Sequence, residues 1–177
     1  LGLNSRVIGG PRFYERQEIR DAMAYFRVVA QSADDLAFER IINVPKRGLG
    51  EAAVRQIHDA SRANRVPMLA AAADLVETEE LKPKVRSTLR TVVELFERWT
   101  KALDEKPHTE LAEQILEESG YTDMWKADRS ADAPGRLENL KELIRSMEDY
   151  ESLRAFLEHV SLVMDAEKNE DLDAVNI

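Results

Sequence analysis

An apolar stripe at helical spacing between residues 83 and 103 constrains this chain more than any other feature of its sequence. Its members recur every three or four residues, so they would share one face of a helix: Val85, Leu89, Val92, Val93, Phe96, Trp99 and Leu103. Shorter stripes of the same kind occupy residues 15–31, 53–57, 68–75, 111–116, 137–147 and 153–164. Turns are scarce, because the 7 glycines and 6 prolines in 177 residues fall below their usual shares of about 7% and 5%. We therefore predict an all-α fold of about eight helices.

Capping residues and prolines predict where these helices begin. Asp34, Thr109 and Ser152 suit N-cap positions because their side-chain oxygens can accept hydrogen bonds from first-turn amides. Pro67 and Pro83 suit first turns, where a missing amide hydrogen costs nothing. In the helix after Asp34, four apolar residues are expected to face inward: Leu36, Ala37, Phe38 and Ile41.

Three segments fall outside the helical pattern. Residues 6–8 form a short β-like run that stops at a Gly-Gly-Pro turn, and a strand is expected there. Residues 174–177 turn β-like at the other end, as if a second strand had begun. Residues 127–135 are small and polar, so we expect there the most exposed and least ordered loop.

Charge is divided unevenly along the chain, whose net charge is −9. Residues 1–100 hold 16 basic and 14 acidic residues, a net +2, whereas residues 101–177 hold 9 and 20, a net −11. Between residues 40 and 65, six cations face only two carboxylates: Arg40, Lys46, Arg47, Arg55, Arg62 and Arg65 against Glu51 and Asp59. This one basic patch indicates either an anion-binding site or ordinary solvated helix faces.

The sequence offers little for catalysis, metals or membranes. Without cysteine there is no disulfide, thiolate nucleophile or zinc ribbon, and the three histidines lie in different segments: His58, His108 and His159. Neither a phosphate-binding loop nor the H-E-x-x-H or G-x-S-x-G motif is present. No stretch approaches the roughly 18 apolar residues of a membrane span, and the first residues lack a signal-peptide pattern. We therefore expect a cytoplasmic chain with no catalysis, metal or cofactor of its own.

The most informative segment for function is Pro-Lys-Arg-Gly-Leu-Gly at residues 45–50, just before a predicted helix. Gly48 and Gly50 can adopt positive φ and turn consecutive amides outward, while Leu49 between them can plug inward. The helix N-terminus adds partial positive charge, and cations stand on both sides. Such a segment would hold a phosphate through its backbone without reading base identity. The predicted DNA-binding residues are Lys46, Arg47, Gly48, Leu49, Gly50 and Arg55.

An ordinary glycine-rich connection between helices is the alternative interpretation of this segment. Glu51 would lie in the first turn of the following helix, where its charge favours the helix but repels a phosphate. From the residues alone, the two interpretations are about equally supported.

Three stretches of the sequence resemble UvrD/PcrA/Rep-type superfamily-one DNA helicases. Residues 9–21 are similar to that family's G-G-x-R-F-x-E-R-x-E-I-K-D stretch, and residues 38–50 to its F-x-R-I-I-N-x-P-x-R-G-I-G stretch. Residues 136–143 resemble its R-x-E-N-L-x-E-L stretch. The departures are Arg20 in place of Lys, Leu49 in place of Ile, and Ser5 where an aromatic residue is common.

The resemblance implies that the chain is a fragment of such a helicase. Residues 33–151 would form the helical 2B subdomain, and residues 1–32 and 152–177 would belong to the motor domain called 2A. In that family 2B swivels on 2A, contacts duplex DNA through glycine-containing hairpins and modulates unwinding. ATP and Mg would bind in other parts of the parent protein, because their motifs are absent here.

The resemblance and the residues together favour an accessory domain that binds the duplex DNA backbone, alongside the motor domains of its parent helicase. A rival of another class is a protein-interaction module, whose acidic second half docks a repair or transcription partner. An enzyme ranks third, because no catalytic constellation supports it.

Overall fold

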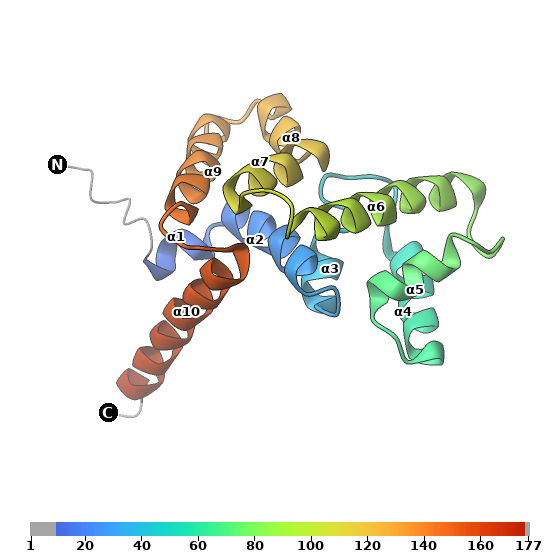
Figure 1. Ribbon diagram of the computed structural model, residues 1–177, viewed down its shortest axis with the longest axis horizontal. Helices are drawn as coiled ribbons and strands as arrows, with labels where there is room; N and C mark the ends of the chain where they lie inside the picture. Colours follow the sequence, from blue (N-terminus) through green and yellow to red (C-terminus); the bar gives the residue numbers. More distant parts are fainter. Residues whose placement is uncertain (1–9, 176–177) are drawn as a thin grey trace.

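The computed structural model describes residues 10–175, and every regular element in that range is an α-helix (Figure 1). The ten helices are α1 (Pro11–Glu15), α2 (Gln17–Ala30), α3 (Asp35–Ile41), α4 (Glu51–Asn64), α5 (Met68–Leu75), α6 (Pro83–Ala102), α7 (His108–Glu118), α8 (Tyr121–Ala127), α9 (Ala133–Met147) and α10 (Leu153–Val175). The all-α prediction is confirmed for these residues. The sequence pattern missed α1 and α8, since each is too short to show a full helical period.

Helix α2 lies at the centre of the molecule, in contact with α1, α3, α6, α7, α9 and α10 (Figure 1). Ten of its 14 residues are buried, so it is enclosed on nearly every side rather than along one stripe. Its neighbours α7, α8 and α9 form one flank, and the first half of α10 packs beside α1 and α2.

The long helix α6 carries the apolar stripe that the sequence predicts. Leu89, Val92, Val93, Phe96 and Trp99 are all buried, which confirms the core face. The Phe96 and Trp99 rings meet edge to face with centroids 5.0 Å apart, and Tyr25 of α2 stacks on the Phe96 ring. This aromatic cluster joins α6 to α2.

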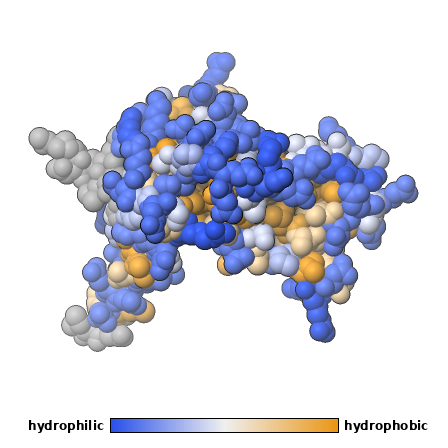
Figure 2. Space-filling view, in the orientation of Figure 1, coloured by the Kyte–Doolittle hydropathy of each residue, from blue (hydrophilic) through white to orange (hydrophobic). Residues whose placement is uncertain are grey.

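Helix α4 packs on α5, and α5 packs in turn on α3 and α6, away from α9 and α10 (Figure 1). The two helices contribute five buried residues to the hydrophobic core: Ala53 and Ile57 of α4, and Met68, Ala71 and Ala72 of α5. Figure 2 shows a mostly hydrophilic face with apolar atoms near its middle. The short loop between α3 and α4 therefore spans from the central helices to this outer pair.

The structure confirms some of the predicted caps and corrects others. The Asp34 side chain accepts a hydrogen bond from the Ala37 amide at 3.1 Å, and Ser152 accepts one from Ala155 at 3.0 Å. Pro83 occupies the first turn of α6 as expected. Thr109 is not a cap, because α7 already begins at His108 after Pro107.

Leu36 does not face inward as expected, and its exposed fraction is 82%. Ala37, Phe38 and Ile41 are buried on the face that α3 turns to its neighbours. Successive helical residues are rotated by about 100°, so Leu36 lies about 200° from Phe38 and cannot share that face.

The exposed loop is shorter than predicted, and the last helix is longer. The loop covers residues 128–132, whereas Ala133 is already buried in the first turn of α9 and Pro134 lies in that turn. Helix α10 continues to Val175, so the strand expected at residues 174–177 is wrong for its first two residues. Six of the eleven residues from 165 to 175 are Ala, Glu, Lys or Leu, which favour a helix over a strand. Residues 176–177 and the strand expected at residues 6–8 lie outside the described range.

Residues 10–175 contain neither a membrane-spanning helix nor a cluster of metal ligands. None of the helices there is long and apolar enough to cross a membrane. That part of the chain also contains no group of three or more His, Cys, Asp or Glu side chains arranged to hold a metal ion.

Candidate nucleic-acid interface

The segment at residues 45–50, here called the glycine loop, leads directly into α4. Gly48 has a φ of 78°, the left-handed conformation expected for both glycines of the loop. Gly50 instead has extended backbone, with φ −84° and ψ −161°, so positive φ at this position is not observed. Leu49 between them is fully buried, which confirms the predicted inward plug. The Val44–Pro45 peptide bond before the loop is cis.

Asn43 holds two amides of the glycine loop against the protein. Its Oδ1 accepts hydrogen bonds from the Arg47 amide at 2.6 Å and the Leu49 amide at 3.2 Å. These two amides therefore face inward and are not free to bind a phosphate. Sequence reasoning missed Asn43, although asparagine side chains in and beside turns commonly bind backbone amides a few residues further on.

Arg47 is half-buried, and its guanidinium contacts the protein. Its guanidinium donates to the Ile41 and Ile42 carbonyls, each at 2.9 Å, and to the Ser119 carbonyl at 3.0 Å. It also donates to the Tyr25 hydroxyl at 2.5 Å. DNA contact by this side chain stays a prediction, and both terminal nitrogens of its guanidinium already donate to α2, the end of α3 and the α7–α8 turn.

Tyr25 links Arg47 to the backbone just before the glycine loop. Its hydroxyl accepts from Arg47 and donates to the Val44 carbonyl at 2.5 Å. Burial raises the pKa of the Tyr25 hydroxyl above its ordinary value, although the neighbouring Arg47 charge opposes the shift. The hydroxyl therefore stays protonated and remains a donor to the loop at physiological pH. No sequence pattern connects Tyr25 with a loop about 20 residues away.

The outer side of the glycine loop is open to solvent. Lys46, Gly48, Gly50, Glu51 and Ala52 are exposed. Within residues 10–175, no hydrogen-bond acceptor contacts the Gly48 or Gly50 amide, and no side chain caps α4. The first amides of a helix have no acceptor within it and carry partial positive charge. The Gly48 and Gly50 amides and the first amides of α4 therefore have no acceptor in the described part of the chain, and Lys46 lies close to them in the sequence.

A groove of about 690 Å³ begins at Gly50 and runs along α4 towards α3. Arg55 and Arg62 line it, and both are exposed. Glu51 and Asp59 line it as well, so the groove carries charges of both signs. On the α3 side, the Glu39 carboxylate contacts the His58 ring. At the loop end, the exposed Lys46 lies near the exposed Glu51, so the charge there is mixed as well.

Two of the sequence stretches that carry the helicase resemblance meet at a buried carboxylate. The Glu18 side chain is only 1% exposed and accepts from Arg16 at 2.8 Å, Arg136 at 3.2 Å and Asn139 at 2.8 Å. Burial alone would raise the pKa of Glu18, but the hydrogen bonds from Arg16 and Asn139 lower it below its ordinary value. This ionised carboxylate joins α2 to α9.

A second carboxylate on the same helix joins α2 to two more elements. Asp21 accepts from Arg40 of α3 at 2.8 Å and from the Tyr121 hydroxyl of α8 at 2.9 Å. Burial raises the pKa of that hydroxyl, and the Asp21 charge raises it further. Asp21 thus holds α2, α3 and α8 together.

The fold and these sequence stretches define the class to which the protein belongs. The whole chain, residues 1–177, matches the family described as the UvrD-like helicase C-terminal domain, and it belongs to that family. The expected likeness to UvrD/PcrA-type helicases is therefore confirmed at the level of the family.

Individual relatives are named DNA helicases. A probable DNA helicase II homolog of Rickettsia conorii is 38% identical over 162 residues, which cover 92% of this chain and 25% of the relative. ATP-dependent DNA helicase PcrA of Staphylococcus epidermidis is 35% identical over 179 residues, and the match covers 97% of this chain and 24% of the relative. DNA helicase II of Escherichia coli is 32% identical over 166 residues, and the match covers 89% of this chain and 23% of the relative. The chain spans about a quarter of the length of these relatives.

Proposed function

We propose that this chain is the accessory part of an ATP-dependent DNA helicase and binds the backbone of duplex DNA without sequence specificity. Residues 33–151 form the 2B-like subdomain, and residues 1–32 and 152–177 are the flanks that join the 2A motor domain. The family match and the names of the relatives support this assignment.

The open amides of the glycine loop carry the proposal. Gly48, Gly50 and the first turn of α4 offer backbone donors to phosphate oxygens, and Lys46 adds a flexible cation beside them. Arg55 lies about one turn further along α4 and reaches a neighbouring phosphate. Backbone donors and single cations do not distinguish bases, so binding is insensitive to sequence and sensitive to salt.

Arg47 and Asn43 act as positioning residues in this proposal. The four acceptors of the Arg47 guanidinium and the two amides held by Asn43 fix the loop in the conformation that turns the other amides outward. Leu49 anchors the loop in the core. Only Lys46, Gly48, Gly50 and Arg55 of the predicted residues are then proposed to contact DNA.

The chemistry of ATP hydrolysis belongs to other parts of the parent helicase in this proposal, together with its Mg. Binding of the duplex by this chain modulates unwinding, because it holds the DNA ahead of the motor domains. Leu162 and Leu172 on α10 are 63% and 61% exposed, which is consistent with a flank that packs against the motor domains.

Charge reversal at the outer face of the loop tests the proposed function. Lys46→Glu with Arg55→Glu should lower the affinity for a blunt duplex at low salt at least about tenfold and flatten the salt dependence by about two units. A matched control, Lys101→Glu with Lys168→Glu, makes the same charge change on exposed cations outside the loop. Equal affinity losses in both pairs, or none in the first, would reject the loop as the DNA site.

The acidic second half favours a second candidate, docking of a repair or transcription protein. Residues 101–177 carry a net charge of −11, which disfavours DNA contact there. Capture of partners by the full chain before and after nuclease treatment separates the two functions, because DNA-bridged partners are lost and direct ones stay.

A further inference from the structure

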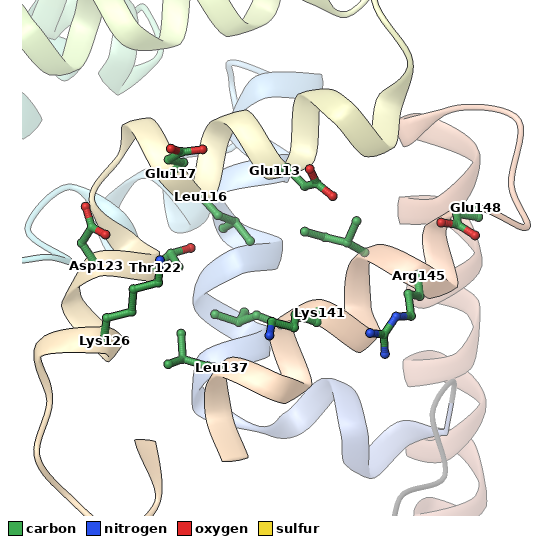
Figure 3. Close-up of a pocket in the computed structure, with 12 residues that line it drawn as sticks. Glu113, Leu116, Glu117, Thr122, Asp123, Lys126, Leu137, Lys141, Arg145 and Glu148 are labelled. Carbon is green, nitrogen blue, oxygen red and sulfur yellow. The ribbon is translucent and has the colours of Figure 1, made fainter. Parts of the chain in front are cut away.

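A second groove lies on the side of the molecule formed by α7, α8 and α9, with a volume of about 610 Å³ (Figure 3). It shares no lining residue with the groove beside the glycine loop. The DNA-binding proposal does not use it.

One face of α9 opens into this groove along most of the helix. Its lining residues follow helical spacing: Leu137, Leu140, Lys141, Ile144, Arg145 and Glu148. The other face of α9 holds buried Asn139, Leu143 and Met147 in the core. Residues 137–148 span about three helical turns, or about 16 Å, so the groove offers a footprint for a helix of that length.

The floor of the groove is apolar. Leu116 of α7 and Leu140 lie at its base, and both are buried. Leu137 and Ile144 are only half-buried and leave apolar surface facing the opening. An occupant that covered this floor would gain from removing apolar surface from water.

The two long walls carry opposite charges (Figure 3). Glu113 and Glu117 of α7 stand one turn apart on one wall, and both are exposed. Lys141 and Arg145 stand on the α9 wall, where their only ion pairs within residues 10–175 are with Glu138 and Glu142 of their own helix. No ion pair in that range crosses the groove or involves Glu113 or Glu117. At one end α8 adds one charge of each sign, Asp123 and Lys126, and at the other end Glu148, just after α9, adds a carboxylate.

We propose that this groove binds an amphipathic helix of a partner protein. The helix presents an apolar stripe of about three turns to Leu137 and Ile144, basic residues to the α7 wall and acidic residues to the α9 wall. Charge complementarity with two oppositely charged walls selects a helix with one basic and one acidic flank over a helix with two like flanks.

Three synthetic peptides of about 18 residues test this proposal on the full chain. All share one leucine stripe, and their flanks carry Lys on one side and Glu on the other, Lys on both, or Glu on both. The mixed peptide should bind at least about fivefold more tightly than either of the others, measured by titration calorimetry. Equal binding of all three peptides, or binding of none, would overturn the proposal.

Variants of the groove make the test specific. Ile144→Glu should weaken the mixed peptide at least about tenfold. Glu113→Lys with Glu117→Lys makes both walls basic and should transfer the preference to the peptide with two Glu flanks. Each variant must keep the circular dichroism spectrum and the duplex affinity of the wild type. An unchanged peptide preference in the double variant would contradict the charge argument.

Two other occupants are separated by further measurements. Self-association of the full chain in sedimentation equilibrium, abolished by Ile144→Glu, would assign the groove to a second copy and overturn the proposal. Peptide binding by this chain but not by the full-length parent would mean that another segment of the parent covers the groove, which would also overturn it.

Discussion

Lys46 and Arg47 are neighbours in the sequence, yet their side chains do different things. Lys46 is exposed at the outer side of the glycine loop, whereas the Arg47 guanidinium has four acceptors inside the protein. A planar guanidinium with five donors suits such a site, and the single ammonium of lysine does not. The sequence predicts a basic patch here but does not reveal which cation faces inward.

Replacing Arg47 should destabilise the chain, whereas replacing Lys46 should not. Arg47→Ala removes one donor from each of the Ile41, Ile42 and Ser119 carbonyls, although Ile41 keeps the Val44 amide, so we expect a loss of about 2–4 kcal/mol in the free energy of unfolding. Lys46→Ala should change it by less than about 0.5 kcal/mol, since the side chain is exposed. Urea unfolding of both variants measures the difference. Equal stabilities would mean that Arg47 does not hold the loop.

Glu18 should make the stability of the chain depend on pH in the acidic range. Its pKa is lower in the folded chain than the ordinary value of about 4.3, so ionised Glu18 stabilises the fold above that value. This stability is lost as the pH falls through the lowered pKa and the carboxylate is protonated. Glu18→Gln should cost about 3 kcal/mol at neutral pH, because Arg16 and Arg136 lose their buried counter-charge, and the cost should shrink in acid. A constant cost across the pH range would contradict the assigned ion pairs.

At the scale of elements, the two glycines of the loop have different conformations and should respond differently to alanine. Gly48 lies at positive φ, where any side chain is strained, whereas Gly50 is extended with no atom within 4 Å of an added Cβ. Gly48→Ala should therefore cost about 1 kcal/mol and lower duplex affinity, while Gly50→Ala should leave stability nearly unchanged. Thermal unfolding and duplex titration measure both. A larger effect at Gly50 would show that the loop geometry is wrong.

Most of the helices could be predicted from the sequence because their apolar stripes are long. The α6 stripe and the caps at Asp34 and Ser152 follow directly from residue type and spacing. The inward Arg47 could not be predicted, because it depends on which elements pack there, and α8 is too short to show a helical period. The outward position of Leu36, in contrast, follows from helical geometry once Phe38 is placed inward. Long-range contacts such as Tyr25 with Val44, or Glu18 with Arg136 and Asn139, leave no local pattern.

At the scale of the whole molecule, charge separates two surfaces. The first half carries the glycine loop and a small positive net charge, and the second half carries a net −11 and the groove between α7 and α9. DNA and an acidic surface repel each other, so the two halves are suited to different partners.

Salt should therefore act on the two surfaces differently. Duplex affinity of the full chain should fall steeply between low and moderate salt, because phosphate binding releases counterions. Binding of the mixed-flank peptide should fall less, because burial of apolar surface contributes to it and is not screened. Parallel titrations over the same salt series measure the two slopes. A duplex affinity that is insensitive to salt would contradict phosphate binding.

The central claim is that the outward amides of the glycine loop hold duplex phosphates, and amide chemical-shift mapping tests it most directly. The isotope-labelled full chain is titrated with a blunt duplex at low salt while every backbone amide is followed by nuclear magnetic resonance. We predict the largest shifts at Gly48, Gly50 and the first turn of α4, and smaller shifts at Arg47 and Leu49, whose amides Asn43 already binds. Shifts centred on another surface, with the loop amides unmoved, would contradict the account.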